Sequence, residues 1–329
     1  MIALLARRLG HGVLVLFVVS LLAFLLSTVV GDPVASILGL SATPEDRIEL
    51  AHRLGLDRPW FVRYADFIWN ALHFRFGMSY SAQRPVADLL IERIPATIEL
   101  ASVALVISLS VGIPLGLAAA VNRGKWWATV LMSFSVIGLS LPTFVVGILL
   151  IFVFSVQLGW LPSFGRGETV AIGWWTTGFL TKSGLLALIM PATALAISQV
   201  ALIARLVRAE MLDVLRADYI RFARARGIAQ RSIEFSHALR NTLIPVITVS
   251  GIQLGFLVAF AIVAEAVFQW PGLGLLFITA LGSTDIPVIS AFLLLAAVFF
   301  VAINFIVDLL YVVVDPRLRA GTAGAGASL

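Results

Sequence analysis

The sequence predicts an all-α integral membrane protein with six transmembrane helices. Composition is the first observation: 60% of the 329 residues are hydrophobic, 12% are charged and the mean hydropathy is +1.03, whereas soluble domains carry about 25% charged residues. The second is a series of apolar runs, each long enough for the roughly 20 residues of one helical crossing. The third is that arginines gather between these runs, because an arginine at the bilayer centre costs about 2.5 to 3.5 kcal/mol.

The first apolar run follows Arg7 and Arg8. It is too long for the core of a signal peptide and lacks a small-residue cleavage site, so we expect an uncleaved N-terminal anchor over residues 1–30. We then expect an extracytoplasmic segment (31–95), a transmembrane core (96–314) and a cytoplasmic tail (315–329). The six predicted spans cover residues 9–30, 96–121, 127–156, 185–207, 243–268 and 287–314.

The connections between the runs predict the orientation. Basic residues follow the second, fourth and sixth spans, and so share one side of the membrane with Arg7 and Arg8. The positive-inside rule makes this side cytoplasmic, together with both termini. Segment 31–95 has seven arginines against eight acidic residues, and a loop of this length crosses largely regardless of charge. We expect it outside, with a short surface helix that begins at Pro44 after an N-cap at Thr43 or Ser41.

The long cytoplasmic loop, 208–242, is basic and has a helical pattern. Its stretch YIRFARARGIAQRSIEFSHALRN contains five arginines. Leu215, Tyr219 and Phe222 recur at helical spacing, Gly227 interrupts, and a second helical pattern leads into the fifth span. Such a pair is typical of a lipid-surface helix, of a solvated positive-inside loop and of a docking element for a soluble partner. The pattern alone does not choose among the three.

The same loop resembles that of the permease subunits of bacterial ATP-binding-cassette (ABC) importers of the dipeptide, oligopeptide and nickel class. The general pattern of such loops is E-A-A-x3-G-x9-I-x-L-P. Ala223, Gly227 and Leu239 match it. His237 and Arg240 replace the isoleucine and the proline, and an Arg-Phe pair replaces Glu-Ala, as in the variant typical of the peptide class. The residues that the resemblance assigns to ATPase coupling are Ala223, Arg224, Ala225, Arg226, Gly227, Ile228, His237, Leu239 and Arg240.

Further blocks extend the resemblance over nearly the whole chain: GDPVASILG, RLGLDRPWFVRY, RPVADLLIERIPATIELA, GLSLPTFVVGILLIFVFSVQLGWLP, FQWPGLG and INFIVDLLYVVVDPRLR. The resemblance implies the type I permease fold and half of a translocation pathway for peptides or glutathione, with chelated nickel as the alternative cargo. It implies a second homologous permease, two ATPase subunits, an extracytoplasmic solute-binding protein and the lipid bilayer as partners. The implied location is the inner membrane of a bacterial cell. Gly227 would be either a helix break that lets an ATPase approach closely or a plain helix C-cap.

No phosphate-binding GxxxxGK[ST] loop occurs in this sequence. We therefore expect a transport subunit without enzyme activity and without a cofactor of its own, so that ATP and magnesium are bound by the partner ATPases. The four histidines are dispersed and cysteine is absent, so no metal site is expected. Positive-inside topology explains the basic residues, so nucleic acid is not expected as a partner. Outside the class, an ATP-independent secondary transporter would explain the spans but not the partner-type loop.

Polar residues inside the predicted spans are candidates for the pathway or for hydrogen bonds between helices. They are Gln199, Gln253, Glu265 and Asn304. Glu265 directly precedes the FQWPGLG turn, and hydrogen bonding to backbone donors of that turn is the favoured interpretation. Two glycine pairs, 112/116 and 251/255, have the GxxxG spacing of closely packed helices, and prolines at positions 114, 142 and 191 are candidates for kinks.

Overall fold

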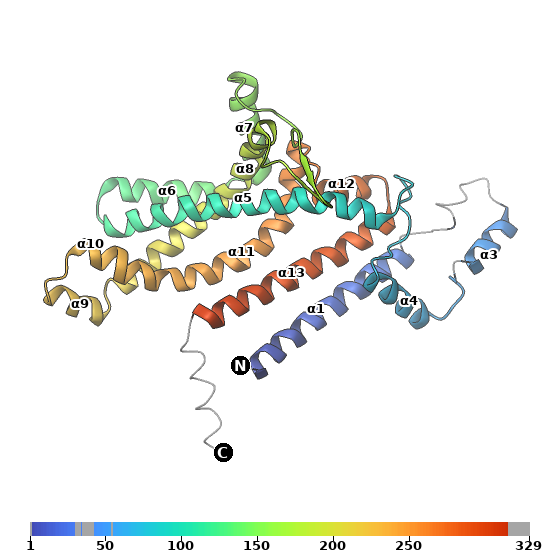
Figure 1. The fold of residues 1–329 in the computed structure, drawn as a ribbon, viewed down its shortest axis with the longest axis horizontal. Helices are drawn as coiled ribbons and strands as arrows, with labels where there is room; N and C mark the ends of the chain where they lie inside the picture. The colour runs from blue at the N-terminus through green and yellow to red at the C-terminus, as the bar shows by residue number, and fades with distance from the viewer. Residues whose placement is uncertain (1, 30–33, 35–42, 54, 315–329) are drawn as a thin grey trace, which may run out of the picture.

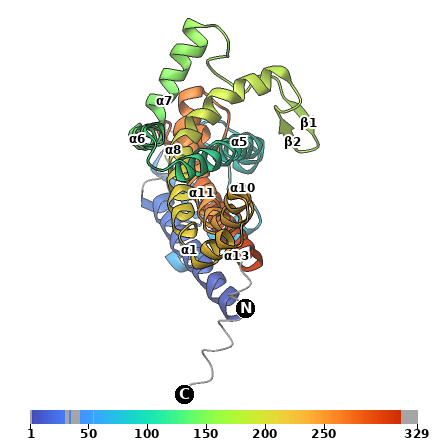
Figure 2. The same cartoon turned by 90° about the vertical axis from the view of Figure 1, so that its left-hand side faces the viewer.

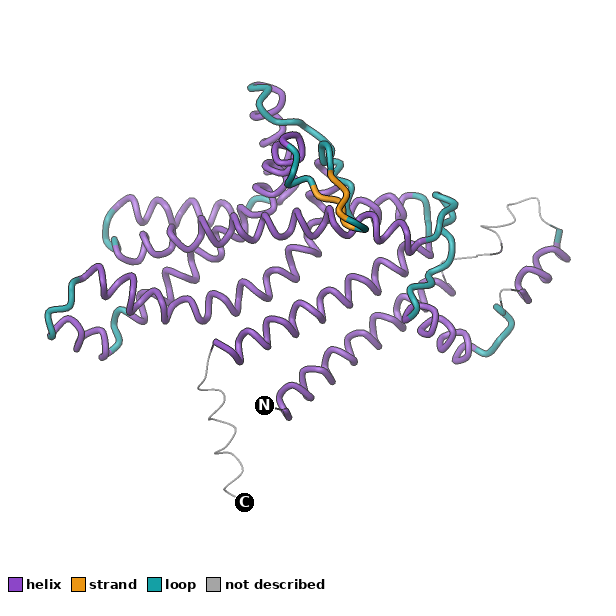
Figure 3. Tube along the Cα trace, in the orientation of Figure 1, coloured by secondary structure: helices purple, strands orange, loops and turns teal. Residues whose placement is uncertain are grey.

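A computed structural model describes residues 2–29, 34, 43–53 and 55–314. Apart from one short hairpin, the regular structure of this part of the chain is helical, as predicted (Figure 3). The long helices lie side by side (Figure 1). The loop 208–242 lies at one end of this bundle, and the helices of segment 31–95 lie at the other.

The helices follow one another along the whole described chain. Their bounds are α1 (Ile2–Val29), α3 (Pro44–Arg53), α4 (Trp60–Leu72), α5 (Val86–Val121), α6 (Trp126–Ser140), α7 (Thr143–Leu150), the π-helical η1 (Ile151–Gln157), α8 (Lys182–Val214), α9 (Asp218–Ala225), α10 (Gln230–Ser232), the π-helical η2 (Ile233–Ala238), α11 (Leu239–Phe268), α12 (Leu273–Gly282) and α13 (Ile286–Val314).

Six membrane crossings result when bent helix pairs are counted as single spans. Four described helices, α1, α5, α8 and α13, are individually long and apolar enough to cross. The fifth predicted span, within α11, is bent by 48°. The third predicted span is more strongly broken, because α6 and the α7–η1 segment meet at an angle of 104°.

Proline chemistry accounts for the break in the third span. Pro142 has no backbone N–H and disfavours helical backbone at the residue before it. Accordingly, Leu141 is extended (φ −79°, ψ 123°) and α7 begins directly after Pro142. Pro114 and Pro191, by contrast, lie inside the continuous helices α5 and α8.

The two predicted glycine pairs lie where helices pack closely. A Cβ on Gly112 would come within 2.9 Å of Ile203 on α8, and one on Gly116 within 2.7 Å of Val207. On the other side of the core, Gly251 of α11 meets Val307 of α13 in the same way. The absence of side chains at these positions lets the helix backbones approach, as the GxxxG spacing predicted.

α1 lies at the edge of the bundle and packs mainly on α13 (Figure 1). Ser290 of α13 donates a hydrogen bond from its Oγ to the carbonyl oxygen of Ala23, at 3.3 Å. Much of the remaining surface of α1 is apolar and exposed, for example Val13 at 64% and Leu22 at 58%. This exposed surface is apolar, as contact with lipid acyl chains requires.

Segment 31–95 has more structure than the sequence predicted. α3 begins at Pro44, and the Oγ1 of Thr43 accepts a hydrogen bond from the Asp46 backbone N–H at 3.2 Å, which confirms the predicted cap. α4 was not predicted, and α5 begins ten residues before the predicted start at 96.

One hairpin departs from the all-helical prediction. β1 (Val170–Ile172) and β2 (Trp175–Thr177) pair antiparallel, with Val170 opposite Thr177. Figure 2 shows that the hairpin and α7 both project from the bundle. The packed helices of the bundle, rather than the hairpin, therefore position the loop 208–242.

Candidate functional site

The candidate coupling loop is fixed to the membrane core through the inner face of α9. Ile220 and Ala223, three residues apart on this helix, are buried. They belong to one apolar cluster with Ile203 and Val207 of α8 and with Ile233 of η2. α9 is therefore close-packed on α8 and η2 through these buried side chains.

Gly227 ends α9 in a Schellman motif. Its φ is 77°, the left-handed region that glycine adopts without strain. The N–H of Ile228 bonds to the carbonyl oxygen of Ala223 at 3.2 Å, and the N–H of Gly227 bonds to that of Arg224 at 3.0 Å. A Cβ on Gly227 would meet no atom within 4 Å. The C-cap interpretation thus describes the local geometry, and the open space around this residue leaves room for a partner.

The second half of the loop runs into α11 without a break. η2 is continuous with the first residue of α11, Leu239, which packs partly against the buried cluster. Asn241 donates from Nδ2 to the Tyr219 hydroxyl at 2.8 Å, which ties α9 to α11. Nδ1 of His237 lies 3.1 Å from the carbonyl oxygen of Ser232. The loop is therefore held in a defined conformation by packing and hydrogen bonds.

The outer face of the loop is basic and aromatic. Phe222 is 63% exposed, and the guanidinium of Arg226 lies 5.4 Å from the centre of its ring. Arg221 pairs only weakly with Asp218, at 3.5 Å between two exposed side chains. The other predicted coupling residues on this face, Arg224, Ala225 and Arg240, are exposed. This face would suit a partner surface with acidic residues and an apolar pocket.

The predicted polar residues of the spans do not form one cluster. Glu265 is fully buried at the far end of α11, where it bonds the turn that follows the helix. Its Oε2 accepts from the N–H groups of Gly274 and Leu275 at 2.6 and 3.0 Å, and its Oε1 accepts from Thr97 Oγ1 at 2.6 Å. The carboxylate thereby caps the start of α12, whose N-cap residue, Gly272, has no side chain to do so.

Gln199, Gln253 and Asn304 lie in three different surroundings. Oε1 of Gln199 on α8 is buried without a hydrogen-bond partner among the described residues. Gln253 is half-buried on α11. Nδ2 of Asn304 donates to the Phe300 carbonyl oxygen of its own helix at 2.8 Å, beside a cavity between α1 and α13. The buried Oε1 of Gln199 therefore has hydrogen-bonding capacity left for a passing ligand.

A buried ion pair that was not predicted anchors the loop before α8. Arg166 donates from Nη2 to Glu99 Oε2 on α5 at 2.6 Å, and the two side chains are only 6% and 2% exposed. The same guanidinium donates to the carbonyl oxygen and the hydroxyl of Thr176 on β2, at 2.6 and 3.0 Å. It thus fastens the hairpin to α5. A carboxylate inside an apolar span was the sequence signal that could have found this site.

A second buried polar cluster lies at the start of α13. We refer to this cluster, to the Glu99–Arg166 ion pair and to the Glu265 cap as the polar latches. Asp285 is buried and accepts hydrogen bonds from the hydroxyls of Ser79 and Ser81, at 2.6 and 2.7 Å. Burial raises the pKa of Asp285, but these bonds and the Ser81 N–H outweigh it, so its pKa lies below the ordinary value. The carboxylate therefore holds the turn before α5 in its ionised form.

Helices of membrane length, with buried polar clusters at one end and a basic loop at the other, define a multi-span membrane protein. The chain belongs to the family described as binding-protein-dependent transport system inner membrane component, whose sequence profile matches residues 112–320. The profile for the N-terminal part of such membrane components matches residues 1–101. The chain is therefore a multi-pass permease subunit of an ABC importer in the inner membrane, as the resemblance predicted.

Relatives with named cargoes cover nearly the whole chain. A peptide transport system permease protein of Brucella abortus is 40% identical over 97% of this chain and 99% of its own length. A di/tripeptide transport system permease of Pseudomonas aeruginosa is 39% identical over 97% and 99%. A glutathione transport system permease of Escherichia coli is 38% identical over 95% and 97%.

A solved structure supports the fold. A chain of the MetNI methionine ABC transporter in an inward-facing conformation superposes with a TM-score of 0.55 at 21% identity. The match covers 69% of this chain and 96% of that one. At this identity, the likeness supports the ABC permease fold alone.

Proposed function

We propose that this permease conducts peptides, with glutathione among the candidate cargoes, and that the loop 208–242 couples it to separate ATPase subunits. Its partners would be a second, homologous permease, two ATPases that bind ATP and magnesium, and an extracytoplasmic solute-binding protein. Relatives named for peptide, di/tripeptide and glutathione transport favour this cargo over chelated nickel. Both termini and the loop 208–242 would be cytoplasmic, as the basic residues indicate.

The observation that carries the coupling proposal is the two-sided character of α9. Its inner side chains, Ile220 and Ala223, are buried against the core, whereas Phe222 and the neighbouring arginines are exposed at the end of the bundle. An ATPase that grips the outer face and moves when ATP binds would displace α9 as a rigid lever. Because α9 packs on α8 and hydrogen-bonds to α11, the spans would rock between two states, which is the requirement of alternating access.

The test is Gly227→Glu, with Gly124→Glu as the matched control. Both glycines have positive φ, at 77° and 90°, and neither has an atom within 4 Å of an added Cβ. Each variant therefore carries a similar backbone strain of about 1 to 2 kcal/mol, but only one places a charged side chain on the proposed docking face. We expect Gly227→Glu to abolish ATP-dependent peptide uptake at normal membrane levels, and Gly124→Glu to retain it.

A cross-linking experiment tests docking and orientation together, since the chain has no cysteine of its own. A cysteine at Ala225 should cross-link to an ATPase subunit and react only when the cytoplasmic face is opened. A cysteine at Glu49 should react from outside in sealed cells. Near-normal uptake by Gly227→Glu, together with no cross-link from Ala225, would show that the arginines are topology signals only.

A further inference from the structure

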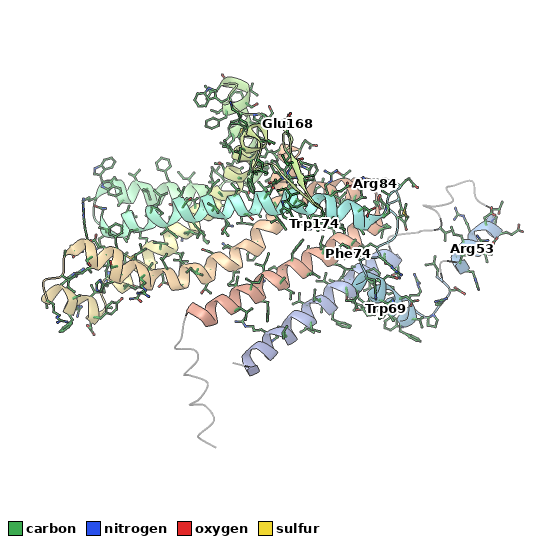
Figure 4. All side chains as sticks on the ribbon, in the orientation of Figure 1. Arg53, Trp69, Phe74, Arg84, Glu168 and Trp174 are labelled. Atoms are coloured by element: carbon green, nitrogen blue, oxygen red, sulfur yellow. The ribbon has the colours of Figure 1, made fainter. Side chains whose placement is uncertain are left out.

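α4 has an apolar face that nothing in the described chain covers. Phe61, Trp69 and Leu72 are 60, 64 and 75% exposed and fall on one side of the helix at its 3.6-residue period. The polar residues Arg63, Asp66 and Asn70 lie on the opposite side, at spacings of three and four. Figure 4 labels Trp69 at this end of the molecule. This is the pattern of a helix that lies in a membrane interface.

Contacts with α1 give the depth of α4 in the membrane. The Tyr64 hydroxyl lies 2.7 Å from Ser20 Oγ, and the rings of Tyr64 and Phe67 pack against Phe24 at centroid distances of 5.4 and 5.8 Å. Ser20 precedes the last residue of the span, Thr28, by eight positions, which is about 12 Å along a helix. α4 therefore reaches alongside the spanning part of α1, where its exposed aromatic face meets lipid.

Arginines gather at the level where the span ends. A cavity of about 450 Å³ lies between α4 and the outer ends of α1 and α13, and Arg58, Arg63 and Arg75 line it. Arg58 pairs with Asp66 at 3.5 Å. Within the described part of the chain, the Arg63 side chain donates only one long hydrogen bond, to the Leu56 carbonyl oxygen at 3.5 Å. Among the described residues, the guanidinium of Arg75 has no ion-pair or hydrogen-bond partner, and its backbone N–H donates to the carbonyl oxygen of Asn70 at 2.8 Å. Positive charge is thus in excess where lipid phosphates lie.

We propose that α4 is embedded in the bilayer interface at the end of the bundle opposite the loop 208–242, and that this site binds an anionic phospholipid. The aromatic face would contact the acyl chains, while Arg63 and Arg75 would bind the headgroup phosphate. A soluble protein partner fits less well, because the apolar face lies at the depth of the span. This lipid site goes beyond the transport role and does not depend on which cargo is carried.

Spin labels on single cysteines test the embedding of the full chain in bilayers. A label at Leu72 samples the apolar face, and a label at Asn70, two residues away on the polar face, is the matched control. We expect oxygen, which concentrates in lipid, to relax the Leu72 label preferentially, and a water-soluble nickel chelate to relax the Asn70 label. If the nickel chelate reaches both labels equally, α4 is not embedded.

Lipid preference tests the arginines. With a fluorophore on a cysteine at Leu72, we expect a quencher-labelled phosphatidylglycerol to quench more strongly than the same label on phosphatidylcholine. The preference should fall about fivefold for each arginine removed, so roughly 25-fold in Arg63→Gln/Arg75→Gln. Arg84→Gln is the control, because Arg84 is exposed and already paired with Glu92.

Two outcomes of the lipid experiment would overturn the headgroup site. Equal quenching by the two lipids in the unmodified chain would mean that the arginines do not select charge. Loss of the preference on addition of inorganic phosphate would indicate a site for a free anion. A preference that persists in excess phosphate supports the lipid.

Discussion

Removing one member of the buried ion pair between Glu99 and Arg166 should destabilise the protein far more than removing both members together. Arg166→Met would leave the Glu99 carboxylate, 2% exposed, with one long hydrogen bond from the Gly178 N–H at 3.4 Å. Removing one member of a buried ion pair costs about 3 to 5 kcal/mol, because the other charge stays buried without compensation. We expect that loss for Arg166→Met.

Glu99→Leu should cost somewhat less. The guanidinium of Arg166 would keep its two acceptors on Thr176, so we expect about 3 kcal/mol, the lower end of the range for a broken pair. The double variant removes both charges and leaves mainly the Thr176 carbonyl oxygen without its donor, at a cost of about 1 to 3 kcal/mol. Because this is far below the sum of the single losses, the coupling energy should be about 3 to 7 kcal/mol.

Denaturant unfolding of the purified protein in detergent, measured for the four members of the cycle, checks this expectation. A spin label on a cysteine at Trp174 reports the hairpin separately, and it should become mobile in Arg166→Met. Additive losses, or a single-variant loss below about 1 kcal/mol, would refute the reasoning, since they would mean that water reaches and solvates these charges.

Two further predictions concern the other polar latches. Asp285→Asn should destabilise the protein at neutral pH, but the difference should shrink as the pH falls below about 4, because a carboxyl whose folded pKa is lowered loses its stabilising contribution on protonation; thermal unfolding at both pH values checks this, and an equal difference at both would contradict it. Gly272→Ala should weaken α12, because an added Cβ would collide with the Glu265 carboxylate; proteolysis near residue 282 should speed up, whereas Gly282→Ala, with no atom within 4 Å of an added Cβ, should not have this effect.

The spans and the basic loop were predictable because each depends on local information. Runs of apolar residues predict the membrane spans. The sequence pattern around Gly227 predicts a helix end regardless of the tertiary contacts of the loop. α4 was missed although its polar residues Arg63, Asp66 and Asn70 share one side, because a helix of 13 residues is too short to be recognised as a membrane span. The long segment around it also reads as nearly neutral and polar overall.

The latches depend on distant partners and were not predictable in the same way. Arg166 and Glu99 are 67 positions apart, and Asp285 and Ser79 are 206 apart, so no spacing rule connects them. The fold also decides which polar residues are buried. Glu265 was recognisable as a polar residue in a span, but nothing in the sequence marks Thr97, at the edge of an apolar run, as its hydrogen-bond partner. Only the packed bundle brings these groups together.

The packing of α1 against α13 has a consequence for how the chain is made. Among the described helices, α1 is synthesised before all the others, yet α13, on which it mainly packs, begins at Ile286 and is synthesised last. At about 5 to 20 residues per second, roughly 15 to 50 s separate the two. During that interval α4 can pack on part of α1, but the insertion machinery and surrounding lipids must accommodate the hydrophobic face that later meets α13. The packing of this permease is therefore complete only when α13 has been inserted against α1.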